Sequence, residues 1–222
     1  MIGRGIQNYL RLALALAVLT GLHRLLILNL DVSYNFGSVY FGPTSRVAVL
    51  QAWWQQYQAA VTTGLLSDFI FVLCGSLLAF VISPRWMLLP LVLLAIFYGA
   101  NIEHVHYNFA HIKLGTMYMA LDPTFVAGSG LTPEMLLNTG TLVATAFVMY
   151  RATRFVALRV ISGGVVAAMF AAVVLFPPNI NPLDPGWMQT HPLVVSISTG
   201  STGEGHSDFA ANALDSHPAA IP

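Results

Sequence analysis

The chain has 222 residues, of which 56% are hydrophobic and only 8% are charged. Soluble domains carry about 25% charged residues, so the composition excludes an ordinary soluble domain and indicates an integral membrane protein. The formal net charge is zero and the sequence has no basic cluster, which argues against nucleic acid as a partner.

Five apolar segments are long enough to cross a bilayer, whose hydrocarbon core takes about 20 helical residues. In chain order they are Tyr9–Leu30, Ala59–Ile82, a segment from about Trp86 through Ala100, Pro133–Tyr150 and Phe155–Phe176. Prolines end two of these segments: the second stops at Ser83-Pro84 and the fifth at Pro177-Pro178. The predicted fold class is therefore an all-α integral membrane protein, with five transmembrane helices in residues 1–178.

The distribution of Lys and Arg predicts the orientation. If the five spans alternate, six arginines fall on one side: Arg4, Arg11, Arg85, Arg151, Arg154 and Arg159. The loops on the other side contain only Arg46 and Lys113. Because basic residues concentrate in cytoplasmic loops, we expect a cytoplasmic N-terminus and an extracytoplasmic C-terminal tail. The chain is therefore predicted to be a multi-pass membrane protein.

Two segments outside the helices also carry predictions. The loop Asp31–Gln58 is rich in aromatic residues and glutamines, which favours an interfacial segment with Trp53, Trp54 and Tyr57 at headgroup level. The tail, residues 179–222, is rich in Pro, Gly, Ser, Thr and Asn. Its start, NINPLDPGWMQTHPLVV, is predicted to pack on the membrane face, and its remainder to form a linker.

The third segment turns polar without a helix breaker, in the stretch Tyr98–Asp122. On a continued helix, Asn101, His104, Asn108 and His111 fall within about 80° of one another and form one stripe, with Tyr107 at its border. Glu103 and His106 point to other faces. Lipid offers no hydrogen-bond partners, so the stripe needs protein or water beside it.

The ionisable residues of the first three helices converge in depth. Arg24, Asp68, Glu103 and His104 all lie in the predicted outer half of the bilayer. Such residues are costly in a membrane and usually face a partner or a cavity, so we expect Arg24 to pair with Asp68 or Glu103. Two interpretations stay open: an ion pair that only holds the helices together, or an outward-facing cavity that contacts substrate.

Neither metal-binding nor catalytic signatures are convincing. His104 and His111 share a face but lie about 10 Å apart along a helix, too far to share one ion. The sequence has no GxSxG elbow, P-loop or CxxC motif. We therefore predict no metal ligand, no cofactor, no catalytic residue and no complete active site in this chain, and expect histidines that line a wet groove.

Three short motifs occur in this helical plan: GLLSDF (Gly64–Phe69), YGANIEHVHYNF (Tyr98–Phe109) and the tail start PNINPLDPGWMQTHPL. With them, the chain resembles the N-terminal membrane domain of the lipoteichoic-acid-synthase-like branch of the alkaline phosphatase/sulfatase superfamily. Such proteins continue into an extracytoplasmic catalytic domain with a metal-bound Thr or Ser nucleophile. That domain transfers phosphoglycerol or phosphoethanolamine from a lipid, or hydrolyses sulfate esters.

The resemblance implies that this chain is the non-catalytic membrane part of such a transferase or hydrolase, with an outward-facing groove for a lipid headgroup. Its tail would lead to a catalytic domain, absent from this chain, that holds a divalent metal; a partner subunit on the same side is the alternative. Arg24 and Lys113 would be the phosphate contacts. The full set of expected substrate-binding residues is Arg24, Asp68, Asn101, Glu103, His104, Tyr107, Asn108, His111 and Lys113.

Two other functions stay open. The chain fits a small integral subunit of a larger redox or photosynthetic complex, in which the histidines bind a pigment, haem or quinone. A transporter or channel with Arg24, Asp68 and Glu103 along its path is a further alternative. The sequence shows no inverted repeat, which disfavours the transporter.

Overall fold

The computed structural model describes residues 2–32, 46–113, 132–181 and 184–198, and these contain helices and no strand. Five helices are long: α1 (Ile2–Leu30), α2 (Arg46–Gly75), α3 (Leu88–Asn108), α6 (Pro133–Ala152) and α7 (Val156–Leu175). A 3-10 helix, η3 (Ser76–Phe80), continues α2, and two short helices follow α7: α8 (Gly186–Gln189) and α9 (Pro192–Ser198). The all-α fold class is thus confirmed for the described part of the chain.

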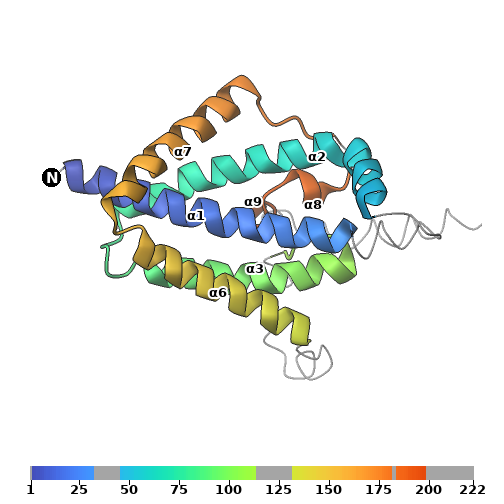
Figure 1. The fold of residues 1–222 in the computed structure, drawn as a ribbon, viewed down its shortest axis with the longest axis horizontal. Coiled ribbons are helices and arrows are strands. Elements are labelled where there is room, and N and C mark those ends of the chain that lie inside the picture. Colours follow the sequence, from blue (N-terminus) through green and yellow to red (C-terminus); the bar gives the residue numbers. More distant parts are fainter. Residues whose placement is uncertain (1, 33–45, 114–131, 182–183, 199–222) are drawn as a thin grey trace, which may run out of the picture.

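Helix α1 lies at the centre of the bundle. It packs against α2, α3, α6 and α7, and successive long helices run in opposite directions (Figure 1). Buried side chains along α1, such as Leu12, Leu19 and Ile27, belong to the same apolar core as Leu91 and Ile102 of α3. The chain segment with α8 and α9 returns to this bundle beside α2 (Figure 1).

Among the described residues, three helical segments are long and apolar enough to cross a membrane: Arg4–Leu30, Arg46–Phe80 and Leu88–Asn108. Large apolar side chains are exposed on the outside of the bundle, including Leu25 (66% exposed) and Val81 (85%). An apolar exterior around buried charges is what a lipid environment favours. The structure therefore supports the assignment of this chain as a membrane protein. Helices α6 and α7 occupy the expected places, but the count of five spans stays a prediction.

The largest departure from the predicted helices is at the start of α2. Residues 46–58, expected in an interfacial loop, are helical from Arg46 onward. Trp53 faces the protein interior with 3% of its surface exposed, and its indole N–H donates to Asp31 Oδ2 at 2.7 Å. The expectation of a Trp53 ring at the lipid headgroups is therefore wrong, because a buried carboxylate offers the indole a protein partner. Trp54 is exposed.

Helices α3 and α6 pack closely at Gly99. A Cβ atom added there would lie 2.0 Å from Thr139 Oγ1 and 2.7 Å from Thr139 Cβ. Replacement of Gly99 with alanine is therefore expected to separate the two helices and to lower the free energy of unfolding by about 1–3 kcal/mol. Unfolding in mixed micelles measures this. The control is Gly140→Ala on α6, where a new Cβ meets nothing within 4 Å; equal stability of the two variants would contradict the close packing.

Candidate functional site: a buried polar network beside a cavity

Arg24 and Asp68 form a buried ion pair between α1 and α2. Arg24 Nε lies 2.7 Å from Asp68 Oδ2, and Nη2 lies 2.8 Å from Oδ1, so the contact is bidentate. Both side chains are almost fully buried, at 3% and 5% exposure. Of the two partners expected for Arg24, the structure has Asp68; Glu103 contacts Thr132 instead.

The remaining N–H groups of Arg24 bind backbone carbonyls. Nη1 donates to the oxygens of Trp187 and Met188, and Nη2 to those of Thr190 and Gly64. A guanidinium has five N–H donors, so these bonds and the ion pair use all of them. Arg24 therefore holds the returning segment that follows α7, Gly186–Ser198, onto α1 and α2. We call this segment the return segment.

A second contact of the return segment is the ring of His191. His191 Nε2 lies 2.7 Å from the hydroxyl of Tyr98, which in turn lies 2.9 Å from Thr20 Oγ1. The ring stacks on Phe71 at a centroid distance of 3.7 Å, and the backbone N–H of His191 donates to Ser67 Oγ. This chain of contacts connects α1, α2 and α3 through one histidine of the tail.

Asn101 connects two further histidines. Its Nδ2 donates to His23 Nε2 at 3.2 Å and to His111 Nδ1 at 3.1 Å. Each of these two histidines therefore accepts the hydrogen bond through the nitrogen named. His111 Nε2 then carries the proton and donates to the carbonyl oxygen of Thr190 at 3.1 Å. Asn101 Oδ1 accepts the backbone N–H of Ile112. The amide of Asn101 thus fixes the tautomer of His111, which also binds the return segment.

The polar stripe does not lie on one continued helix, and this expectation is wrong. Helix α3 ends at Asn108, and Phe109 has a left-handed backbone with φ of 52° that reverses the chain. His111 therefore comes back to Asn101 through a turn. His104 and Asn108 stay on the helix, where the two side chains hydrogen-bond to each other at 3.2 Å nearer the surface.

Burial of His111 predicts acid sensitivity. Removal from water is the main cause that lowers the pKa of His111 to about 4, and the positive charge of Arg24 acts in the same direction. In the unfolded chain the pKa is about 6.5, so between pH 6.5 and 4 the unfolded state binds more protons than the folded state. Stability should therefore fall as the pH falls through this window, by about 3 kcal/mol for this residue.

Unfolding in mixed micelles at several pH values measures this effect. His111→Gln keeps a polar side chain but does not titrate. Between pH 6.5 and 4 it should lower the slope of unfolding free energy against pH by the amount that corresponds to at most one bound proton. His191 stays in this variant, and burial lowers its pKa well below the ordinary value too, so some slope remains. An unchanged slope would show that His111 is solvated in the folded protein.

A separate cavity lies at the end of the bundle where α1 and α3 end and α6 begins. Its volume is about 280 Å³, and its lining residues are Leu30, Glu103, His106, Tyr107, Thr132, Glu134 and Asn138. Thr132 caps the N-terminus of α6 and its hydroxyl also donates to Glu103 Oε1 at 2.9 Å. This hydrogen bond positions one carboxylate of the cavity.

The expected substrate-binding residues therefore divide into three groups. Arg24, Asp68, Asn101 and His111 belong to the buried network that holds the return segment. Glu103 and Tyr107 line the cavity. The third group belongs to neither the buried network nor the cavity lining and contains His104, Asn108 and Lys113. Asn108 and Lys113 are exposed. Because Arg24 has no N–H left for a ligand, the structure favours the interpretation of its ion pair as one that holds helices together.

Several residues of both features were not predicted. The network also contains Thr20, His23, Tyr98 and His191, and the cavity also contains His106, Thr132, Glu134 and Asn138. Within the described residues, no three His, Cys, Asp or Glu side chains are placed to hold a metal ion. Comparison with protein-family models, curated proteins and solved structures finds no match to this chain.

Proposed function

We propose that this chain is the membrane domain of a lipid-dependent phosphoglycerol or phosphoethanolamine transferase, or of a sulfatase-like hydrolase, in the bacterial cytoplasmic membrane. In this proposal five helices span the bilayer, the tail emerges on the extracytoplasmic side, and the chain itself contributes no catalytic residue. The divalent metal and the nucleophile belong to an extracytoplasmic catalytic domain or partner subunit.

The observation that carries the proposal is the return segment. After α7 the chain comes back and is fixed by Arg24 and His191 through contacts with α1, α2 and α3. A segment held in this way fixes the point at which the chain leaves the bundle, and the predicted linker follows it. An enzyme that acts on a membrane lipid gains from a tether fixed at its membrane end, because the tether keeps the reactive groups close to the headgroup.

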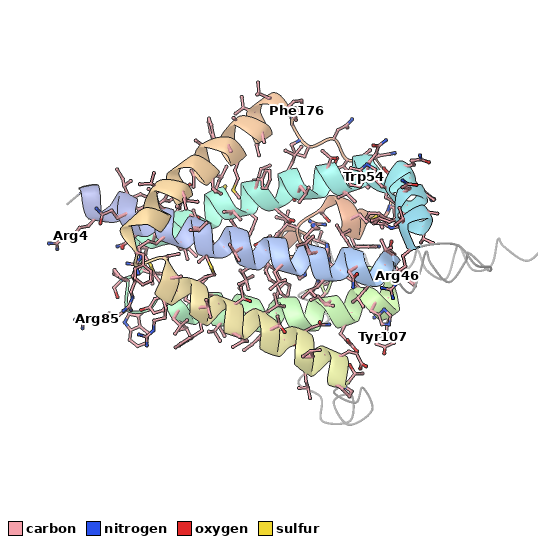
Figure 2. All side chains as sticks on the ribbon, in the orientation of Figure 1. Arg4, Arg46, Trp54, Arg85, Tyr107 and Phe176 are labelled. Carbon is pink, nitrogen blue, oxygen red and sulfur yellow. The ribbon has the colours of Figure 1, made fainter. Side chains whose placement is uncertain are left out.

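The distribution of charge supports the orientation. Arg4 and Arg85 lie at one end of the bundle, and Arg46 and Tyr107 lie at the other end (Figure 2). The end with the larger share of the arginines in the sequence fits the cytoplasmic side. The 280 Å³ cavity, which Tyr107 lines, would then open on the extracytoplasmic side, where a lipid headgroup meets a catalytic domain.

Lipid analysis of the full chain tests the proposal. The protein is purified from bacterial membranes in a mild detergent, and its bound lipids are quantified by mass spectrometry against the lipids of the whole membrane. We expect about one glycerophospholipid per chain, of a class enriched over the bulk membrane. Asn138→Phe, which fills the cavity, should remove this lipid, and Leu89→Phe on the exposed surface of α3 should not.

Two results would contradict the proposal. A bound-lipid composition equal to that of the membrane, in the native chain and in both variants, would remove the headgroup site. A visible absorbance band in the purified chain would instead support the alternative, a subunit that binds a pigment or haem through its histidines.

A further inference from the structure

We infer that the cavity between α1, α3 and α6 binds a primary ammonium group, and that its ligand is the ethanolamine headgroup of a phospholipid. The lining side chains alone support an ammonium site. The choice of a lipid as the source of the ammonium rests on the proposed function.

Charge is the first argument. Glu103 of α3 and Glu134 of α6 bring two carboxylates to one cavity, and no lysine or arginine is among the described residues that line it. Thr132 occupies only one oxygen of the Glu103 carboxylate. A site with this charge attracts a cation and disfavours an anion inside it, so the ammonium end of the headgroup, and not its phosphate, would occupy the cavity.

The ring of Tyr107 is the second argument. It lines the same cavity, lies edge-on to the His106 ring at a centroid distance of 4.8 Å, and leaves 64% of its surface exposed. Its faces carry partial negative charge, which attracts an ammonium group. Carboxylates together with an aromatic ring recognise an organic cation better than a metal ion, which prefers oxygen or nitrogen ligands on all sides.

Size and polarity identify the part of the ligand that binds here. The volume of about 280 Å³ suits a headgroup and not acyl chains, and Leu30 is the one aliphatic residue among the described lining residues. Leu136 and Leu137, which follow Glu134 closely on α6, are exposed and give the acyl chains an apolar surface outside the cavity. The headgroup and its chains thus have separate places.

Hydrogen bonding separates the ethanolamine headgroup from choline. A primary ammonium donates three hydrogen bonds, which the carboxylates of Glu103 and Glu134 and the amide oxygen of Asn138 are able to accept. A trimethylammonium group donates none and would leave these acceptors unpaired at a cost in affinity. We therefore expect the order ethanolamine, then choline, then glycerol among lipids with equal chains.

Binding of short-chain lipids to the full chain in detergent tests the inference. Dihexanoyl phosphatidylethanolamine, phosphatidylcholine and phosphatidylglycerol, and free ethanolamine, are titrated by native mass spectrometry. We expect the ethanolamine lipid to bind at least about tenfold more tightly than the glycerol lipid. Glu103→Gln and Glu134→Gln should each weaken it by about tenfold and leave the glycerol lipid unaffected or bound more tightly. Asp184→Asn, which removes a carboxylate outside the cavity, is the matched control.

The outcomes separate this inference from the proposed function. Equal binding of the ethanolamine and glycerol lipids, or no effect of either Glu variant, would overturn the ammonium site and leave the proposed lipid-dependent function standing. Free ethanolamine that binds as tightly as its lipid would keep the ammonium site but overturn the lipid source, and with it the proposed function. Circular dichroism of each variant checks that the helices are intact.

Discussion

Replacement of Arg24 with methionine is expected to lower the free energy of unfolding by about 3–5 kcal/mol. The substitution removes a bidentate partner from Asp68 and leaves that carboxylate buried without a counter-charge. It also removes the donor to the carbonyl oxygens of Trp187, Met188 and Thr190. Unfolding of the full chain in mixed micelles, followed by circular dichroism, measures the loss.

Two further variants test whether the buried ion pair causes this loss of stability. Arg24→Met combined with Asp68→Leu should recover part of it, because a buried pair replaced by apolar residues no longer leaves a single charge in the core. The control is Arg154→Met, whose exposed guanidinium lies over the half-buried Tyr150 ring and should contribute less than about 1 kcal/mol. A loss at Arg24 no larger than that at Arg154 would show that the ion pair is solvated and open to ligands.

Helix positions and the ion pair were largely predictable from the sequence. The apolar runs set the start of α3 and both ends of α6 and α7 to within about two residues, since in a bilayer length and hydropathy determine where a helix fits. The pairing of Arg24 followed from depth, because two opposite charges at similar depth in lipid have few other partners. The start of α2 was missed because its polar first turns read as a loop.

The return segment was not predictable. Its composition, rich in Pro, Gly and polar residues, is typical of a linker, and four residues of α8 carry no period that a sequence can show. Its contacts with Arg24 use backbone carbonyls, which every residue has. His191 gave one signal, because it is the one ionisable residue of Gly186–Ser198. The expectation that this stretch packs on the membrane face did not include its burial in the bundle, where Trp187, Met188, Gln189 and His191 are buried.

The cavity was predicted in part. Glu103 and Tyr107 were expected to contact substrate, but as companions of Arg24 rather than as a site of their own. Their partners Glu134 and Asn138 come from α6, and the position of α6 against α3 depends on the close approach of Gly99 and Thr139. A glycine that permits two helices to approach looks in the sequence like any other glycine. The remainder of the tail, residues 199–222, and its predicted role as a linker lie outside the described residues.

Gly64 offers the most direct test of the return segment. A Cβ atom added at Gly64 would lie 1.9 Å from the carbonyl oxygen of Met188 and 2.9 Å from Arg24 Nη1. Gly64→Ala is therefore expected to push the segment off α2 and to lower the free energy of unfolding by about 1–3 kcal/mol, although alanine is the better helix former. Hydrogen exchange followed by mass spectrometry should show at least tenfold faster exchange in residues 184–198.

The matched control is Gly21→Ala on α1, where a new Cβ meets nothing within 4 Å. It should leave exchange in residues 184–198 unchanged and raise stability by up to about 1 kcal/mol, because alanine favours a helix over glycine. Unaltered exchange in Gly64→Ala would mean that the segment is not docked on α2. Faster exchange confined to the segment, with α1 and α3 still protected, would show that the bundle folds without it. The return segment would then act as a mount added to a complete helical domain, which is the arrangement that the proposed function requires.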